Sequence, residues 1–299
     1  MKIIIIGQAV VDIIEEDNLT STKPGGIYYS TIGALQIGKF IDEIYLITNY
    51  SKNYKELFSS AFDNVNLTLS KSVRNIPTVN LKIYKDKERD EKYSLITQKI
   101  KLPLEKSLNK FDGILVNMIS GFEITIGHFE IIRKYFFGPI YLDIHSLSRG
   151  FDKNNNRKFR QIPSVKRWLD CADIVQCNES ELLTICESNI EQEIVNFVFR
   201  RRPRLLIVTR ANRGATLYTD FDDRDRERFD VVPIKITAKN SVGCGDIFGA
   251  TFLSNYADFD RRNILTALRN ANIAAGLFTQ YITVEDFEKL GEDFTKYNA

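Results

Sequence analysis

The chain has 299 residues, of which 43% are hydrophobic and 27% are charged, an ordinary balance for a globular protein with a large core. Its 41 basic and 39 acidic residues leave a formal charge of +2, which gives no electrostatic reason to expect nucleic acid or a membrane surface as partner. No apolar run approaches the roughly 20 residues of a membrane span, and no secretory signal pattern is present. The sequence therefore predicts a cytoplasmic protein.

Short runs of Ile, Leu and Val recur along the chain and are expected to form buried strands, at 3–6, 44–47, 114–116, 140–142, 174–175 and 205–208. Helix-like segments lie between them, at 28–37, 125–135, 179–187 and 190–201. Continuous apolar runs, rather than alternating ones, are typical of strands covered on both faces by helices. The pattern predicts an α/β fold with a mostly parallel central sheet flanked by helices in three layers.

Two early stretches depart from this rhythm. Residues 78–84 and 92–97 surround a charged turn, and the alternation in the first of these arms predicts an antiparallel hairpin with one face in water. Residues 15–24 form a second insertion between the first strand and the first helix. They predict either a small antiparallel β lid or ordinary surface decoration. We expect one domain over residues 1–299, with lid insertions at about 13–24 and 72–100.

The later part of the chain adds fewer signals. Residues 152–160 are polar and are expected to form a loop, and residues 220–228 a charged turn between two strands. The sequence holds 4 cysteines and 2 histidines, without the paired spacing of a zinc site or of a disulfide framework. We therefore expect Cys171, Cys177 and Cys186 to be buried free thiols, and no cage of His and Cys around a metal.

The most informative stretch runs from Asn240 to Ala250. Gly243 and Gly245 flank the small Cys244, so that successive backbone N–H groups can point into one concavity. A helix that begins there adds the positive end of its dipole and favours a bound phosphate. Asp246 lies on its first turn. Phosphoryl transfer to a hydroxyl needs such an anion site beside a base, although an ordinary capped helix would also explain the pattern.

Other polar turns follow predicted strands at their carboxyl ends, where open α/β sheets bind ligands. Gly7 to Asp12 follows the first strand, and Gly25-Gly26 precedes the first helix. Asn178 to Glu181 and Thr209 to Gly214 follow two later strands. Asn178 and Glu181 also have the spacing of a helix capping box, so a purely structural role is open for this pair.

These motifs resemble those of the ribokinase-like carbohydrate kinases, also called the phosphofructokinase B type, from Gly7 to about Gly276. Asn240 to Ala250 is similar to the family signature D-T-x-G-A-G-D-x-F, with Asn240 for Asp and Cys244 for Ala. Gly25 to Ser30 is similar to the family motif G-G-x-x-x-N, and Asp12 matches the sugar-binding aspartate. Asn178 to Glu181 is similar to N-x-x-E, and Asp143 to His145 is similar to D-P-N.

The resemblance implies an ATP-dependent kinase that transfers the γ-phosphate to a hydroxyl, preferably a primary CH2OH, of a small sugar or nucleoside. It implies Asp246 as the catalytic base and Gly243, Cys244 and Gly245 as the anion hole. The implied acceptor residues are Asp12, Gly25, Gly26, Ser30 and His145, and the implied nucleotide residues are Asn178, Thr209, Gly214 and Asn272. Mg2+ would be held at Glu181 through water. The resemblance also allows a monovalent cation as a cofactor. The exposed lid could in addition supply the contact of a homodimer.

Three departures keep a second reading open. Ser30, Asn240 and Ala211 replace family residues, as they could in a catalytically inactive regulatory protein that binds sugar or nucleotide on the same fold.

Tyr28 and Tyr29 either form an aromatic wall that admits a nucleoside or pack in the core. A dehydrogenase is disfavoured because no G-x-G-x-x-G follows the first strand, and a serine hydrolase because G-x-S-x-G is missing from the sequence.

Overall fold

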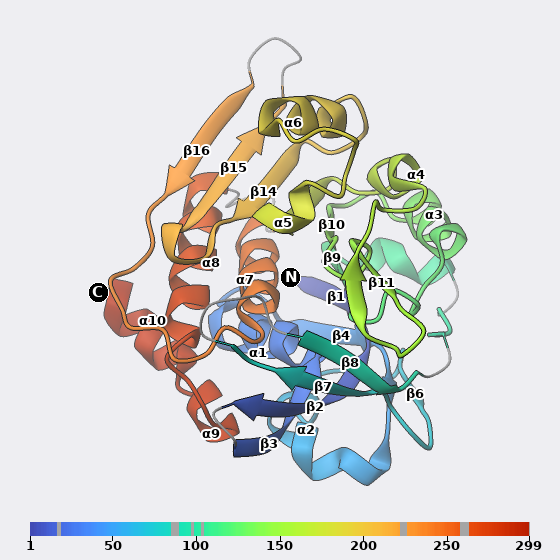
Figure 1. The fold of residues 1–299 in the computed structure, drawn as a ribbon, viewed down its shortest axis with the longest axis vertical. Helices are drawn as coiled ribbons and strands as arrows, with labels where there is room; N and C mark the ends of the chain where they lie inside the picture. The colour runs from blue at the N-terminus through green and yellow to red at the C-terminus, as the bar shows by residue number, and fades with distance from the viewer. Residues whose placement is uncertain are drawn as a thin grey trace.

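The computed structural model describes residues 1–16, 19–84, 90–96, 99–102, 105–221, 226–257 and 263–298. Its centre is an eight-stranded sheet with the strand order β16-β15-β14-β13-β10-β9-β1-β4 (Figure 1). The strands from β14 to β4 pair in parallel, whereas β15 and β16 add to the edge in antiparallel fashion. The predicted α/β fold is confirmed.

Each apolar run of the sequence lies in one of the parallel strands. These are β1 (Lys2–Ile6), β4 (Glu43–Ile47), β9 (Gly113–Asn117), β10 (Ile140–Asp143), β13 (Ile174–Asn178) and β14 (Leu205–Thr209), followed by β15 (Ala215–Thr219) and β16 (Glu227–Val231). Ile3 and Ile5 pack into the core on one face of the sheet, while Ile4 and Ile6 pack into the core on the other. Two buried faces explain why the runs are continuously apolar.

Helices cover both faces of this sheet (Figure 1). One side carries α1 (Ile27–Ile37), α2 (Lys55–Phe62), α7 (Cys244–Tyr256), α8 (Ile264–Phe278), α9 (Val284–Phe287) and α10 (Leu290–Asn298). The other side carries α3 (Ile126–Tyr135), α4 (Val165–Leu169), α5 (Glu179–Leu182) and α6 (Glu191–Phe199). Among the described residues, no helix combines the length and the apolar character that a membrane span requires.

The helix predicted at 179–187 is shorter than expected. The N–H groups of Thr184 and Ile185 bond to the carbonyls three residues earlier, at 2.9 Å and 3.2 Å. The hydroxyl of Thr184 donates to the carbonyl of Glu181 as well, at 2.6 Å. This tighter hydrogen bonding ends the helix after one turn.

A second sheet has the strand order β3-β2-β7-β8 and lies apart from the central sheet (Figure 1). It consists of β2 (Ala9–Glu16), β3 (Leu19–Gly26), β7 (Thr78–Lys82) and β8 (Asp90–Leu95). The expected antiparallel pairing is confirmed for β2 with β3 and for β7 with β8, and a parallel pairing joins β2 to β7. Residues 85–89 of the expected turn and residue 97 lie outside the described residues. We call this sheet the lid.

The prediction of a loop at 152–160 was wrong in part. Arg157–Phe159 forms β12, which pairs antiparallel with β11 (Arg149–Phe151). Between them, the carboxylate of Asp152 accepts hydrogen bonds from the backbone N–H groups of Asn154 and Asn156, at 2.8 Å and 3.0 Å, which is the capped turn that Asp and Asn favour. The hairpin touches the lid, because the N–H of Tyr93 donates to the carbonyl of Asn155 at 3.1 Å.

Short elements complete the chain: β5 (Asn49–Tyr50), β6 (Lys71–Ser72), and the 3-10 turns η1 (Lys52–Tyr54), η2 (Glu105–Lys110) and η3 (Ala211–Arg213). The cysteines are free thiols, as expected, but Cys186 is only partly buried and Cys244 is partly exposed.

Candidate active site

A cavity of about 410 Å3 opens at the carboxyl ends of the parallel strands, between the lid and the start of α7. Its lining includes many of the residues singled out from the sequence: Asp12, Gly26, His145, Asn178, Glu181, Thr209, Gly243, Gly245 and Asp246. Val79, Leu81 and Tyr93 of the lid add an apolar wall. The polar turns that follow separate strands therefore meet at one place.

The glycine turn before α7 has the backbone that its sequence predicts. Gly243 is the N-cap of α7 and has a φ of 84°, a left-handed conformation that favours glycine. A Cβ at this position would lie 2.5 Å from the ring of Tyr29. The side chain of Asn240 closes the turn by accepting a hydrogen bond from the N–H of Val242 at 2.9 Å. N–H groups of the first helical turn have no partner within the helix. At the start of α7 they can therefore bind an anion in the cavity.

Asp246 lines the cavity from the first turn of α7. The side-chain amide of Asn117 donates a hydrogen bond to Oδ1 of Asp246 at 2.6 Å and another to Oγ of Ser30 at 2.8 Å. The sequence reading missed Asn117, although it is the polar residue that ends β9, just as Asn178 ends β13 and Thr209 ends β14. The same signal could have found it.

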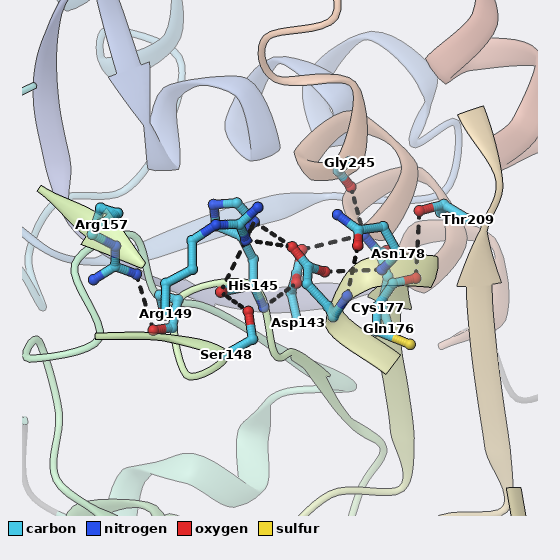
Figure 2. Close-up of polar contacts among 12 residues, drawn as sticks. Asp143, His145, Ser148, Arg149, Arg157, Gln176, Cys177, Asn178, Thr209 and Gly245 are labelled. Atoms are coloured by element: carbon cyan, nitrogen blue, oxygen red, sulfur yellow. Dashed lines mark hydrogen bonds and ion pairs between the residues drawn. The ribbon is translucent and has the colours of Figure 1, made fainter. Parts of the chain in front are cut away.

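Gln176 was also missed. Its side-chain N–H groups donate to the carbonyl of Gly245 at 3.0 Å and to Oδ2 of Asp143 at 3.2 Å, and its Oε1 accepts a hydrogen bond from the hydroxyl of Tyr141. Figure 2 shows this amide between Asp143 and Gly245. It ties β13 to the start of α7 through neutral hydrogen bonds.

Glu181 is the centre of a buried charged cluster with Arg149 and His145. The guanidinium of Arg149 donates to Oε1 of Glu181 at 2.6 Å, and Nδ1 of His145 lies 2.7 Å from the same oxygen. Nη1 of Arg149 lies 2.8 Å from that ring nitrogen (Figure 2). Burial pushes the pKa of Glu181 upward, but His145 and Arg149 outweigh it and lower the pKa from 4.5 to about 2. Glu181 is therefore held as an anion.

Asn178 and Glu181 keep the capping geometry that their spacing predicts. The N–H of Glu181 donates to Oδ1 of Asn178 at 2.8 Å, and the N–H of Asn178 donates to Oε2 of Glu181 at 2.9 Å. The cap and the charged cluster use different oxygens of one carboxylate. The capping contact therefore helps to hold Glu181 in the orientation in which it pairs with Arg149.

The pKa of Asp143 is shifted in the opposite direction to that of Glu181. Asp143 is buried, and its Oδ1 accepts a hydrogen bond from the N–H of His145 at 2.8 Å. Burial, followed by the negative charges of Glu181 and Asp246, raises the pKa of Asp143 well above its usual 3.8. This carboxyl therefore keeps its proton to a higher pH than an exposed aspartate does.

The lid supplies the other polar contact region. Asp12 is buried in β2, and a Cβ on Gly25 of the facing strand would lie 2.1 Å from its carboxylate. Gly26 has a φ of 64°, and a Cβ there would lie 2.3 Å from the carbonyl of Gln8. The two glycines therefore allow the backbone to pass close to the Asp12 carboxylate and to the carbonyl of Gln8.

Several predicted site residues do not belong to the cavity lining: Gly25, Ser30, Cys244, Gly214 and Asn272. Ser30 is completely buried on α1 and reaches the site only through Asn117. Gly214 has a φ of 86°, and a Cβ there would lie 1.9 Å from the carbonyl of Val231. The amide of Asn272 donates to the carbonyl of Val232 at 2.8 Å.

The two tyrosines pack in the core. The ring of Tyr28 contacts those of Phe58 and Phe287, and its hydroxyl lies 2.7 Å from that of Ser60. Tyr29 is also buried, but it contributes to the cavity wall beneath Gly243. Tyr28 therefore offers no aromatic surface to a ligand.

Mg2+ is the cofactor that the sequence leads us to expect. Among the residues that the structure describes, no three His, Cys, Asp or Glu side chains are grouped to hold a metal directly. Both oxygens of Glu181 already accept hydrogen bonds. An anionic carboxylate in this setting fits a hydrated Mg2+ that rests mainly on phosphate oxygens and water.

Comparison with known proteins matches part of the chain to a family model. Residues 145–288 match the model of the pfkB family carbohydrate kinases. This match indicates a pfkB family carbohydrate kinase domain that includes residues 145–288. The matched part of the kinase domain includes the charged cluster and the glycine turn with Asp246. No curated protein matches this chain.

Solved structures share the fold along nearly the whole chain. A sulfate complex of a pyrophosphate-dependent kinase in the ribokinase family is 15% identical, with a TM-score of 0.78, and the match covers 93% of this chain and 95% of that one. A complex of such a kinase with a pyrophosphate analogue and myo-inositol is 15% identical, with a TM-score of 0.76 and coverages of 93% and 94%. Ribokinase of Arabidopsis thaliana with ribose and ATP is 16% identical, with a TM-score of 0.73, and covers 98% of each chain. At these identities the likeness shows the fold of the kinase domain.

Proposed function

We propose that this protein is an ATP-dependent kinase that phosphorylates a hydroxyl, preferably a primary CH2OH, of a small sugar or nucleoside. The observation that carries the proposal is the position of Asp246, on the first turn of α7 and in the same cavity as the glycine turn and Asp12. This places a carboxylate beside an anion site, with a second carboxylate able to anchor an acceptor.

Asp246 is the proposed base because the other two carboxyls beside it are unsuited. Glu181 is committed to Arg149 and His145. Asp143 is buried, and its two oxygens already accept hydrogen bonds from the N–H of His145 and from the side-chain amide of Gln176. Asp246 receives its hydrogen bond from a neutral amide, which leaves its negative charge uncompensated by that partner.

The proposed reaction moves one proton and one phosphoryl group. The acceptor oxygen forms a bond to the γ-phosphorus while its proton passes to Asp246, and the bond from that phosphorus to the leaving ADP oxygen breaks. An ordinary aspartate, with a reference pKa of about 3.9, suffices as base when the transition state is loose and the proton leaves late.

The start of α7 supplies the proposed anion hole. The N–H groups of Gly243, Cys244 and Gly245, together with the helix dipole, would stabilise the charge that develops on the transferred group. Bound Mg2+ would neutralise phosphate charge, with Glu181 reaching it through water. Thr209 and Asn178 line the cavity, and together with Gly214 and Asn272 they are the proposed nucleotide neighbours.

The lid is proposed to exclude water from the reaction. Val79, Leu81 and Tyr93 present an apolar wall to the cavity, and a dry site strengthens the electrostatic contacts and protects the donor from hydrolysis. A dimer through the lid stays a prediction.

The lining favours a sugar or another polyol over a nucleoside. Carboxylates of Asp12 and Glu91 reach the cavity and can accept hydrogen bonds from several hydroxyls, whereas Tyr28 packs away from it. The solved relatives include complexes with ribose and with myo-inositol, which supports the same choice.

The test is phosphoryl transfer by the purified protein with a panel of sugars, polyols and nucleosides. ATP and pyrophosphate should be compared as donors, because a similar structure is that of a pyrophosphate-dependent kinase. We expect a phosphorylated acceptor with ATP and Mg2+, and product formation by Asp246→Asn that is slower by orders of magnitude. Binding of a sugar by the wild-type protein without any turnover would contradict the proposal and support the inactive regulatory alternative.

A further inference from the structure

The amide of Asn117 joins the proposed base to a buried serine. We propose that Asn117 is the positioning residue for Asp246, with Ser30 fixing Asn117 in turn; this inference rests on the proposed function. It assigns a role to a residue that contacts the base without lining the cavity.

The chemistry of the groups fixes the orientation of the Asn117 side chain. Its Nδ2 lies 2.6 Å from Oδ1 of Asp246 and 2.8 Å from Oγ of Ser30. A carboxylate accepts hydrogen bonds only, so the NH2 end of the amide must face it. The two protons of that NH2 group match two acceptors in two directions. Two hydrogen bonds, rather than one, therefore hold the amide in this orientation.

Rigid elements hold the three residues. Asn117 ends β9, which lies between β1 and β10 in the central sheet, and a Cβ on Gly7 would lie 2.2 Å from the Asn117 carbonyl oxygen. Gly33 brings α1 against α7, where a Cβ would lie 3.2 Å from the backbone of Ile247. Ile247 follows Asp246 directly. Close backbone packing of this kind keeps a supporting hydrogen bond in register.

Burial makes the contact specific. Asn117 is 1% exposed and Ser30 is completely buried. Water therefore cannot readily replace Asn117 as the partner of Asp246, or Ser30 as the partner of Asn117. A lysine or arginine in this place would compensate the charge that a base needs. A neutral amide orients the carboxylate and leaves its formal charge in place.

The pair with Ser30 offers a direct way to test positioning. Ser30 stands where the family pattern has Asn, and its Oγ lies 2.8 Å from the Asn117 amide. Exchanging the two side chains, in Ser30→Asn/Asn117→Ser, would deliver an amide to the same region from α1. A positioning role predicts that this exchange restores activity lost in Asn117→Ser.

The experiment compares kcat and KM for the wild type, Asn117→Ser and the exchanged double variant. We expect Asn117→Ser to lower kcat by roughly 10- to 100-fold, because a misplacement of about 1 Å at a reacting group has effects of this size. KM for donor and acceptor should change much less. The exchanged variant should recover roughly tenfold in kcat over Asn117→Ser.

Asn49 provides a matched control. It is also an asparagine at a strand end, 1% exposed, and it lies outside the cavity lining. Asn49→Ser should keep the wild-type kcat even where it lowers thermal stability. Equal losses of kcat in Asn49→Ser and Asn117→Ser, or a wild-type kcat in Asn117→Ser, would overturn the inference.

Two further measurements keep the inference testable. Should Asn117→Ser fail to fold, the isosteric Asn117→Asp removes the donor with little change in shape, and a wild-type kcat in that variant would reject the positioning role. Should the wild type transfer no phosphate, the proposed function fails by itself. Crystal structures of wild type and variant then decide the inference: we expect the Asp246 carboxylate to turn away without Asn117, and an unchanged carboxylate would overturn it.

Discussion

On the α7 side of the cavity, Asp246 receives its hydrogen bond from the neutral amide of Asn117, whereas on the side of β10 and β13, Glu181 is paired with Arg149 and His145. Both arrangements hold a carboxylate in one orientation. In the first, the partner is neutral and leaves the formal charge of the carboxylate in place. In the second, the guanidinium of Arg149 pairs with that charge. This difference between the two carboxylates is the reason why Asp246, rather than Glu181, is the proposed base.

Removing Arg149 from its buried ion pair with Glu181 should have the largest effect on stability. Arg149→Met leaves the buried anion of Glu181 without its closest cation, and such a loss typically costs about 3–5 kcal/mol. Urea unfolding measures the change. Arg167→Met is the matched control, because Arg167 pairs with Glu130 at the surface, where both side chains are exposed, and should cost less than about 1 kcal/mol. Equal costs for the two variants would contradict the comparison.

Lowering the pH should reduce the free energy of unfolding because Glu181 becomes protonated. Its pKa is lowered from 4.5 to about 2, so the unfolded chain takes up a proton on this group first as the pH falls. The resulting stabilisation, on the order of 3 kcal/mol, is complete above pH 4.5 and is lost as the pH falls toward 2. Unfolding free energies between pH 6 and pH 3.5 should therefore fall less steeply in Glu181→Gln than in the wild type. Parallel pH profiles would argue against a paired anion.

Asp143 should respond in the opposite direction. Its pKa is raised by burial and by the charges of Glu181 and Asp246, so the unfolded chain releases this proton at lower pH than the folded protein does. Its contribution is favourable at low pH and is lost as the pH rises above 3.8. We expect Asp143→Asn to stabilise the protein by roughly 1 kcal/mol at pH 7, with a smaller gain at pH 4. A gain that is independent of pH would contradict the raised pKa.

The smallest effect is expected at Ala211, two residues after Thr209 in the turn that follows β14. Ala211 lines the cavity with a φ of 50°, a left-handed conformation that a side chain disfavours. Ala211→Gly should stabilise the protein by up to about 1 kcal/mol, since relief of strain exceeds the added freedom of the unfolded chain. Ala257→Gly, at a φ of −71°, is the control and should destabilise by about 1 kcal/mol in thermal unfolding. Destabilisation by both would show that the turn is unstrained.

The sequence predicted the parallel strands because their Ile, Leu and Val runs, such as Ile3 to Ile6, are buried on both faces. It predicted the glycine turn because the backbone at Gly243 tolerates little else. It missed the hairpin of β11 and β12, whose strands of 3 residues are too short to show a period. Asn117 and Gln176 were missed for another reason: their partners Asp246 and Gly245 lie 129 and 69 residues away along the chain, and only the packing of β9 and β13 against α7 brings them together.

The most direct test of the account is the turnover of Asp246→Asn. This change keeps the size of the side chain and removes its ability to take a proton. We expect kcat to fall by roughly 10²- to 10⁴-fold, the usual contribution of general acid–base catalysis, while the affinity for a non-hydrolysable ATP analogue and the thermal stability stay close to those of the wild type. Near-normal turnover in this variant would contradict the assignment of Asp246 as the base.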